Sequence, residues 1–259
     1  MLTVSSDPSS CIPVPNLQRI ITNPLTTWPS LPGVDYNTVA YHSVPDPPLT
    51  EHGHKQASEL REALRAGILR NRKVSRIIVS PMRRVLQTAH IALDWLIEGE
   101  KVPVVADARW QELYPKPCDT PVPLSQLAPD FPKVDFTQCA NDPVYPDKAS
   151  SAAAKYHYTR TAVLARAQEA LGEIYQLMES NSSQDEVVIV VSHSSFLRVG
   201  VTGRWFWNAD YRVFDLVKGD PGRGEREYEL VEWELTKGKG GMGWSKEVRV
   251  EIGGGLPDA

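Results

Sequence analysis

The 259-residue chain has few cysteines and no long apolar run, which argues against a disulfide-rich protein and against a membrane-spanning one. Its three cysteines, Cys11, Cys118 and Cys139, are odd in number and widely spaced, which argues against a disulfide framework and against a zinc site. This usage suits a reducing compartment. No apolar run approaches membrane-spanning length. Residues 1–16 lack the charged and apolar regions of a secretory signal, so we expect a cytoplasmic protein.

Positive charge is not in excess either, and several motifs of other enzyme classes are missing. The formal net charge of −4 does not indicate a nucleic-acid partner. The sequence has neither the glycine loop of dinucleotide-binding proteins nor the G-x-S-x-G motif of α/β-hydrolases. No cluster of ligand-type residues indicates a metal. We therefore expect no metal, no cofactor, no nucleic acid and no membrane partner.

What the sequence does contain is an alternation of strand and helix patterns. The β-branched run at 187–191 is typical of a strand buried on both faces of a sheet. Strands that alternate with helices predict an α/β fold, a three-layer α/β/α sandwich with a mostly parallel central sheet. The expected strands are 17–22, 74–80, 102–106, 187–191, 211–217 and 228–233, and the expected helices are 56–69 (after an N-cap at Thr50), 85–97, 158–178 and 196–206.

The domain organisation expected from this pattern is simple. Residues 1–16, rich in serine and proline, are expected to form a mobile arm, and residues 17–259 a single α/β domain. The proline-rich segments 23–48 and 107–147 are expected to be loop insertions that form lids or pocket walls. The tail after Thr236 is expected to be a loop with a possible edge strand at 247–252.

Two of the buried strands end in residues that suit an anion. The 187–191 strand is followed by His193, and the strand in IIVSPMRRVLQTA (77–89) is followed by Arg83 and Arg84 at the start of a helix. Arginine is electrostatically unfavourable at a helix N-terminus, and a bound phosphate or carboxylate would offset this. The alternative is a pair of solvated arginines and a histidine that only satisfies a loop hydrogen bond.

Five stretches, taken together and in order, resemble the histidine phosphatase superfamily, in its phosphoglycerate-mutase-like branch and especially its fungal-type members. They cover most of residues 42–216. The stretches are HSVPDPPLTEHGHKQ (42–56), IIVSPMRRVLQTA (77–89), RWQELYPKPCDT (109–120), VVIVVSHSSFLRV (187–199) and NADYRVFDL (208–216).

The resemblance implies roles for three residues. Arg84 would clamp the phosphate, Glu112 would donate the proton to the leaving group, and His193 would help to hold the phosphoryl group in the transition state. This set suits the chemistry, because phosphoryl transfer mostly needs charge stabilisation and alignment. A glutamate beside a phosphate has its pKa raised by the like charge, which suits a general acid. The expected partner is a small anionic substrate, either a phosphate ester or a carboxylate.

The chain departs from this family at the first strand. In the family that strand ends in Arg-His followed by Gly or Ala, and the histidine becomes phosphorylated, but this chain has no Arg-His pair. Two registers remain open. If 17–22 is the first strand, Thr22 and Asn23 occupy the pair. If the segment is aligned backward from DPPLT, Ser30 and Leu31 occupy it. Neither register supplies a nucleophilic imidazole.

Two polar residues of the following loop are further candidates for binding the phosphate. In the second register Asn37 takes the place of a later asparagine of the family's loop. His42 lies near the loop that normally flanks the pocket, and it is the first candidate substitute for the missing imidazole.

Three functions fit these residues. The first is a phosphomonoesterase-type hydrolase of a small phosphorylated metabolite with a degenerate nucleophile site, in which His193, His42 or water attacks. The second is a repurposed acid–base enzyme that acts on a small carboxylate or enolate, with Glu112 and His193 as the pair and Arg84 as the anchor. The third is a non-catalytic relative that binds an anion. Loss of the nucleophile weakens the first function, and the three retained residues argue against an empty pocket.

Overall fold

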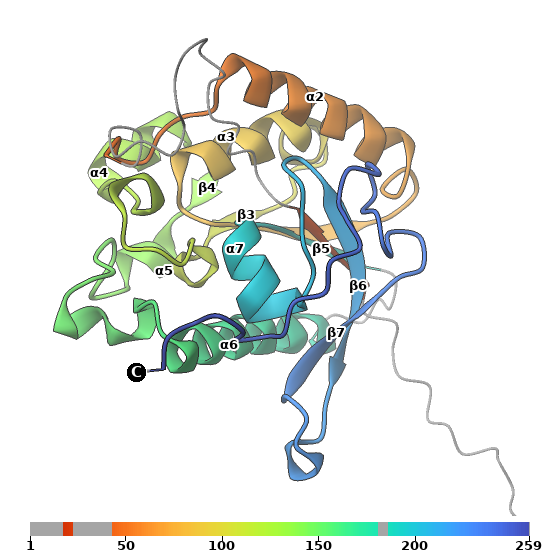
Figure 1. The fold of residues 1–259 in the computed structure, drawn as a ribbon. Helices are drawn as coiled ribbons and strands as arrows, with labels where there is room; N and C mark the ends of the chain where they lie inside the picture. The colour runs from red at the N-terminus through yellow and green to blue at the C-terminus, as the bar shows by residue number, and fades with distance from the viewer. Residues whose placement is uncertain (1–17, 23–42, 181–185, 259) are drawn as a thin grey trace, which may run out of the picture.

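The computed structural model describes residues 18–22, 43–180 and 186–258, and it is built around one seven-stranded sheet (Figure 1). From edge to edge the strand order is β4-β3-β2-β5-β1-β6-β7. Strands β1 to β5 are parallel to one another, whereas β6 is antiparallel to both β1 and β7. The prediction of a mostly parallel sheet is therefore confirmed. The strands are β1 (Gln18–Thr22), β2 (Val74–Val79), β3 (Val104–Ala106), β4 (Val134–Asp135), β5 (Val187–Val191), β6 (Tyr211–Lys218) and β7 (Tyr228–Glu232).

Helices cover both faces of the sheet and complete the three-layer α/β/α sandwich (Figure 1). Because successive strand side chains point to opposite faces, Ile77 and Val79 of β2 pack in the core beneath α2 and α3, whereas Ile78 packs with α6 and α7. All five residues of β5 are buried, as its apolar run predicted. The helices are α2 (Glu51–Ala66) and α3 (Arg83–Ala92) on one face, and α6 (Arg160–Glu179) and α7 (Ser194–Phe196), with its π-helical continuation Leu197–Thr202, on the other.

The register of the central strands aligns their carboxyl ends. Val191 of β5 lies beside Val79 of β2 on one side and beside Thr22 of β1 on the other. The segment 17–22 is therefore the first strand, as in the first of the two registers, although Leu17 lies outside the described residues. Ser80 and His193, which follow β2 and β5, consequently meet at one edge of the sheet.

Helix α2 begins where its capping signal predicts. The Thr50 side chain accepts a hydrogen bond from the Gly53 amide at 3.1 Å, and Glu51 lies in the first turn. The helix ends at Ala66, before Gly67, and so is shorter at its C-terminus than expected. The expected 85–97 and 196–206 helices also end early, because each passes into a π-helical turn, at Trp95–Gly99 and Leu197–Thr202 respectively.

The cap makes a first prediction. Replacing Thr50 with alanine is expected to lower the free energy of unfolding by about 1 kcal/mol, because the amide at Gly53 loses its acceptor. Ser58→Ala in the exposed middle of the same helix is the matched control, since it removes only a bond to the His54 carbonyl. Urea denaturation of the two variants should separate them, and equal midpoints would contradict the capping role.

The 107–147 insertion is not the plain loop that its prolines suggested. It contributes the edge strand β4 and a series of short helices, and its buried apolar residues, including Leu127 and Phe131, join the core on the β3 side. Prolines divide its apolar residues into groups too short to show a period. The short helices are η2 (Ala108–Trp110), η3 (Pro117–Asp119), α4 (Leu124–Leu127), η4 (Ala128–Asp130) and α5 (Thr137–Ala140).

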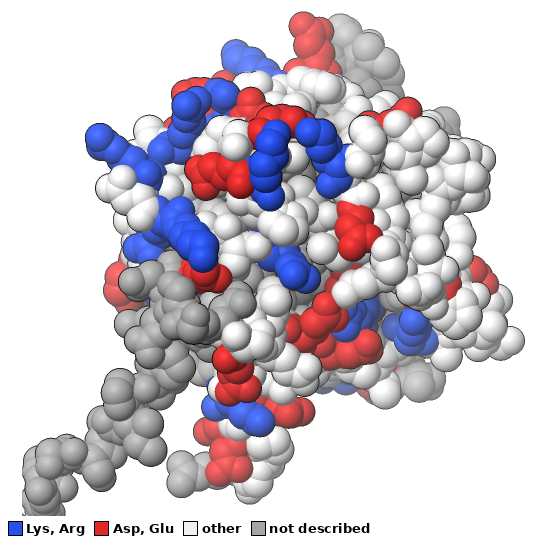
Figure 2. All heavy atoms as spheres, turned by 180° about the vertical axis from the view of Figure 1, so that it is seen from behind, with Lys and Arg blue, Asp and Glu red and all other residues white. Residues whose placement is uncertain are grey.

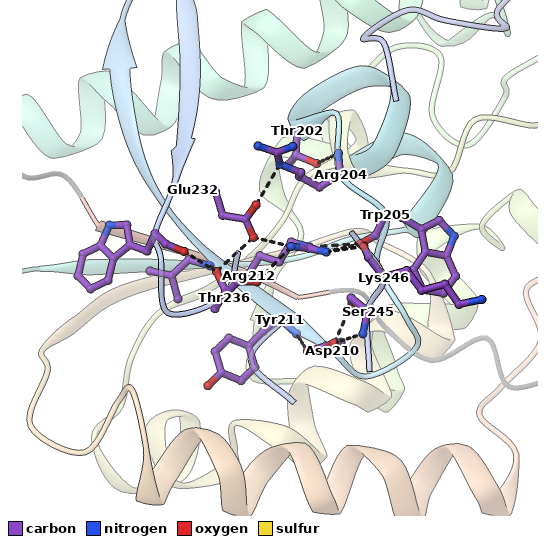
Figure 3. Close-up of polar contacts among 12 residues, drawn as sticks. Thr202, Arg204, Trp205, Asp210, Tyr211, Arg212, Glu232, Thr236, Ser245 and Lys246 are labelled. Atoms are coloured by element: carbon purple, nitrogen blue, oxygen red, sulfur yellow. Dashed lines mark hydrogen bonds and ion pairs between the residues drawn. The ribbon is translucent and has the colours of Figure 1, made fainter. Parts of the chain in front are cut away.

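Asp210, at the start of β6, fastens the C-terminal segment to the sheet (Figure 3). Its carboxylate accepts hydrogen bonds from the backbone amides of Met242, Trp244 and Ser245 at 2.8–3.2 Å, and from the Ser245 hydroxyl at 2.7 Å. This segment forms only an isolated bridge, between Arg204 and Arg249, so the expected edge strand at 247–252 is wrong. The Asp210 side-chain bonds supplement a few backbone bonds, such as that from the Val250 amide to the Gly203 carbonyl.

Arg212 makes a second attachment between β6 and the C-terminal segment (Figure 3). Its guanidinium is 1% exposed and pairs with Glu232 Oε1 at 2.5 Å. It also donates to the carbonyl oxygens of Trp205, Thr236 and Lys246 at 2.9–3.3 Å. Asp210 and Arg212 of the 208–216 stretch therefore have structural roles.

One face of the molecule carries charged side chains of both signs. On the face opposite to that of Figure 1, lysine and arginine side chains are interspersed with aspartate and glutamate (Figure 2). That face therefore offers no broad basic field. Within residues 18–22, 43–180 and 186–258, no helix is long and apolar enough to cross a membrane.

Candidate active site

Arg84 lies at the start of α3, on the sheet edge where β2 and β5 end. Helix α3 has no cap from its own N-cap residue, and the Asp46 carboxylate accepts the Arg83 amide at 2.9 Å instead. The two arginines then diverge. Arg83 reaches outward to pair with Asp130 at 2.5 Å, whereas Arg84 is 2% exposed.

The Arg84 guanidinium is held by groups from two distant segments. Its Nη1 donates to the Cys118 carbonyl at 2.6 Å, and its Nη2 donates to Asp119 Oδ1 at 3.0 Å and lies 3.1 Å from His193 Nδ1. Its Nε is buried without a hydrogen-bond partner among the described residues. A buried N–H donor without a partner can bind an anionic ligand.

His193 is a neutral imidazole with both ring nitrogens engaged. Because an arginine can only donate, His193 Nδ1 accepts from Arg84, and His193 Nε2 carries the proton and donates to Ser80 Oγ at 2.9 Å. Burial, followed by the charges of Arg84, Lys148 and Arg166, holds the pKa of His193 well below 6.5. In this arrangement neither nitrogen has a lone pair free to attack phosphorus.

Glu112 follows the η2 turn and is oriented by two backbone amides. Its Oε1 accepts from the Leu113 amide at 2.9 Å and from the Phe196 amide, in α7, at 3.0 Å. Burial, and then the negative charge of Asp119, raise the pKa of the Glu112 carboxyl above 4.5. Glu112 is therefore fixed in position, and its raised pKa favours the protonated carboxyl group.

Two further buried cations stand near these residues. Lys148 is 2% exposed and Arg166, on α6, is 3% exposed. All three nitrogens of the Arg166 guanidinium are buried without a hydrogen-bond partner in the described part of the chain. Its carbon Cζ lies 4.2 Å from the ring centroid of Phe196, the residue whose amide holds Glu112. Burial lowers the pKa of Arg166 to about 10, which leaves it charged at neutral pH.

The structure thus brings Arg84 and His193 into direct contact and joins Glu112 to the same cluster through Phe196 and Asp119. It says nothing of His42 and Asn37, since both lie outside the described residues. Sequence analysis missed Lys148 and Arg166. Arg166 had a detectable signal, because it interrupts the buried face of α6 between Val163 and Ala170. Lys148 had none.

Across the described ranges, no group of three or more histidine, cysteine, aspartate or glutamate side chains is arranged to hold an ion. Positive charge near Glu112 comes instead from arginine and lysine side chains.

The family follows from a comparison with known proteins. The model of the histidine phosphatase superfamily, branch 1, matches residues 33–210, which is more than half of the chain. The chain belongs to this superfamily. The fold predicted from the strand–helix alternation and the five sequence stretches is therefore the correct one for its family.

One sequence relative and one solved structure show what the chain is similar to. A protein of Schizosaccharomyces pombe, described as a probable phosphatase, is 37% identical over 123 residues. That stretch is 48% of this chain, and it spans only about half of the relative's length, 55%. The crystal structure of the ecdysone phosphate phosphatase from Bombix mori, in complex with tungstate, superposes with a TM-score of 0.51 at 18% identity. The superposition covers 83% of the present chain and 92% of the Bombix chain, which supports a shared fold.

Proposed function

We propose that this protein is a phosphomonoesterase that hydrolyses a small phosphorylated substrate and binds the phosphoryl group through Arg84. One observation carries the proposal, namely the buried Arg84 guanidinium, with an unpaired Nε, in contact with His193. The surrounding charge supports it. Arg84 and Arg166 are buried guanidinium groups, and Arg84 pairs with the carboxylate of Asp119, so a phosphate dianion would add negative charge where two buried cations lie.

We assign His193 an orienting and hydrogen-bonding role. Its neutral ring is fixed between Arg84 and Ser80, so it can stabilise the transferring phosphoryl group only after one of these bonds is exchanged for the ligand. Because the Nδ1 lone pair of His193 accepts from Arg84 and its Nε2 carries the proton, water is the proposed nucleophile. The alternative nucleophile, His42, stays a prediction.

Glu112 is the proposed general acid. Water adds to phosphorus, the P–O bond to the leaving group breaks, and the leaving oxygen takes the proton of Glu112. The product is then dihydrogen phosphate, and one of its protons restores the Glu112 carboxyl. The raised pKa of Glu112 keeps this proton available as pH rises above the usual range of a carboxyl group.

Glu112→Gln tests this role. The amide oxygen of glutamine retains an acceptor for the Leu113 and Phe196 amides, but no proton can be donated. Turnover of an alkyl phosphate is expected to fall by about 10²–10⁴-fold. Turnover of p-nitrophenyl phosphate, whose leaving group needs no proton, is expected to fall far less.

The pH profile provides a second measurement on the same variant. Wild-type turnover of the alkyl phosphate is expected to decline as pH rises through the raised pKa of Glu112, because the donor loses its proton there. Glu112→Gln should lack that decline. Equal losses on both substrates, with an unchanged profile, would exclude Glu112 as the acid. No turnover on a broad phosphomonoester panel, with retained anion binding, would favour the non-catalytic or carboxylate-binding alternatives.

A further inference from the structure

Lys148 is buried although it sits in a polar loop, immediately after the 107–147 insertion. Its ammonium group donates to three backbone carbonyls, those of Glu112 at 2.6 Å, Tyr114 at 2.9 Å and Asp119 at 2.8 Å. An ammonium has three N–H donors. Every donor of Lys148 is therefore used on the backbone, and the side chain has no donor left for a ligand.

The three carbonyls belong to a single loop that supplies part of the candidate site. Residues 112–119 carry the Glu112 carboxyl at one end, and at the other end the Cys118 carbonyl and Asp119 carboxylate that hold Arg84. Lys148 bonds to both ends of this loop and to its middle. It therefore fixes the separation between the proposed acid and the acceptors of the proposed phosphate-binding arginine.

The charges around Lys148 come from every element packed against it. The carboxyl groups of Glu112 and Asp119 attract its proton, whereas Arg84 on α3 and Arg166 on α6 repel it, and the neutral His193 ring also lies within its field. Burial, and then Arg166, lower the pKa of Lys148 to about 7. In return, the ammonium charge acts to lower the pKa of Glu112 against the effect of burial.

We propose that Lys148 is a positioning residue, which holds the 112–119 loop so that the Glu112 carboxyl and the Arg84 guanidinium face one substrate, and which compensates the negative charge of that loop. The kinetic part of this inference rests on the proposed phosphomonoesterase function. The structural and electrostatic part does not.

Lys148→Met removes the ammonium and retains most of the side-chain stem. We expect kcat for an alkyl phosphate to fall by about 10²-fold, because misplacement of a catalytic group by about 1 Å has an effect of this size. We also expect the decline that follows deprotonation of Glu112 to move up by about one pH unit, because Glu112 loses a neighbouring positive charge. A role limited to packing would lower kcat without moving the profile.

Lys148→Arg and Lys116→Met are the comparison variants. Arginine keeps the charge but cannot direct three donors at the same carbonyls, so kcat should fall by about 10-fold with the profile unmoved. Lys116 is an exposed lysine of the same loop, and its replacement should change neither quantity. If Lys148→Met does not fold, wild-type kcat in Lys148→Arg would still overturn the positioning role.

A readout independent of turnover separates this inference from the proposed function. Infrared titration of the protonated carboxyl band, assigned with Glu112→Gln, reports the midpoint of Glu112 in wild type and in Lys148→Met. If the Glu112 midpoint rises in Lys148→Met while the wild-type protein hydrolyses no phosphomonoester, the role of Lys148 is supported and the proposed phosphomonoesterase function is rejected. An unmoved midpoint in an active protein would reject the electrostatic role of Lys148 and leave the proposed function intact.

Discussion

Replacing Arg84 with alanine is expected to lower kcat/KM for a phosphomonoester by about 10³-fold and to remove binding of inorganic phosphate. The guanidinium bonds to His193 and to the Cys118 and Asp119 end of the 112–119 loop. Its removal takes away the donors proposed for the phosphoryl oxygens. It also leaves Asp119 near the site with one cation fewer to balance it.

The adjacent Arg83 offers a matched control for this variant. Arg83→Ala removes the same side chain one residue earlier, where it pairs with Asp130 at the surface, and its backbone bond to Asp46 is retained. Activity and phosphate binding should change little. Calorimetry with phosphate, sulfate and small dicarboxylates, together with thermal melts to establish folding, compares the two. Equal phosphate binding by folded Arg84→Ala and Arg83→Ala proteins would rule out Arg84 as the anion clamp.

Arg212→Met is expected to produce the largest loss of stability, about 3–5 kcal/mol in the free energy of unfolding. The substitution leaves the Glu232 carboxylate, whose side chain is 2% exposed, with Arg204 as its remaining ion-pair partner at 2.9 Å. It also removes the donors to the carbonyls of Trp205, Thr236 and Lys246. Buried acceptors left without donors are expensive.

Lys237→Met is the control for the Arg212 variant. Lys237 pairs with Glu234 at the surface, where ion pairs contribute about 0–1 kcal/mol. Urea midpoints of the two variants should therefore differ widely. The Arg212 variant should also make the 236–256 segment more sensitive to limited proteolysis, because Arg212 bonds to the Thr236 and Lys246 carbonyls and adds to the backbone bond from the Gly241 amide to the Tyr211 carbonyl. A midpoint like that of Lys237→Met would show that the Asp210 bonds and the backbone bonds hold the segment without Arg212.

The sequence predicted the central part of the fold because two of its strands carry a strong physical signal. The 74–79 and 187–191 strands are β-branched and buried, and parallel strands place the residues that follow them at a common edge. The sequence alone therefore predicts that Arg84 and His193 lie close together. Glu112 could not be placed in this way, since it lies in an irregular segment without periodicity, and only its motif identified it.

Other features had no local signal. Strand β4 has two residues, and prolines on both sides of it conceal the apolar residues of its segment. Lys148, between an aspartate and an alanine, has the local sequence of a solvated loop lysine. Its burial results from carbonyls that lie 29–36 residues earlier in the chain. Arg166 shows that a charged residue on the apolar face of a helix can be recognised as buried from the sequence. The helix periodicity must be assigned first, because a charged residue is otherwise assumed to face solvent.

The spread of the site along the sequence has a consequence for how the protein folds. Arg84 and Ser80 meet His193 across 109 and 113 residues, and Arg84 meets Cys118 and Asp119 across 34 and 35. Each contact closes a long loop, and contacts of this kind form slowly because chain entropy opposes them until both segments are ordered. Helices α2 and α6 can form early from local contacts, whereas anion binding must wait for β2, β5 and the 112–119 loop to assemble. During refolding, recovery of helical signal should therefore precede recovery of the binding site.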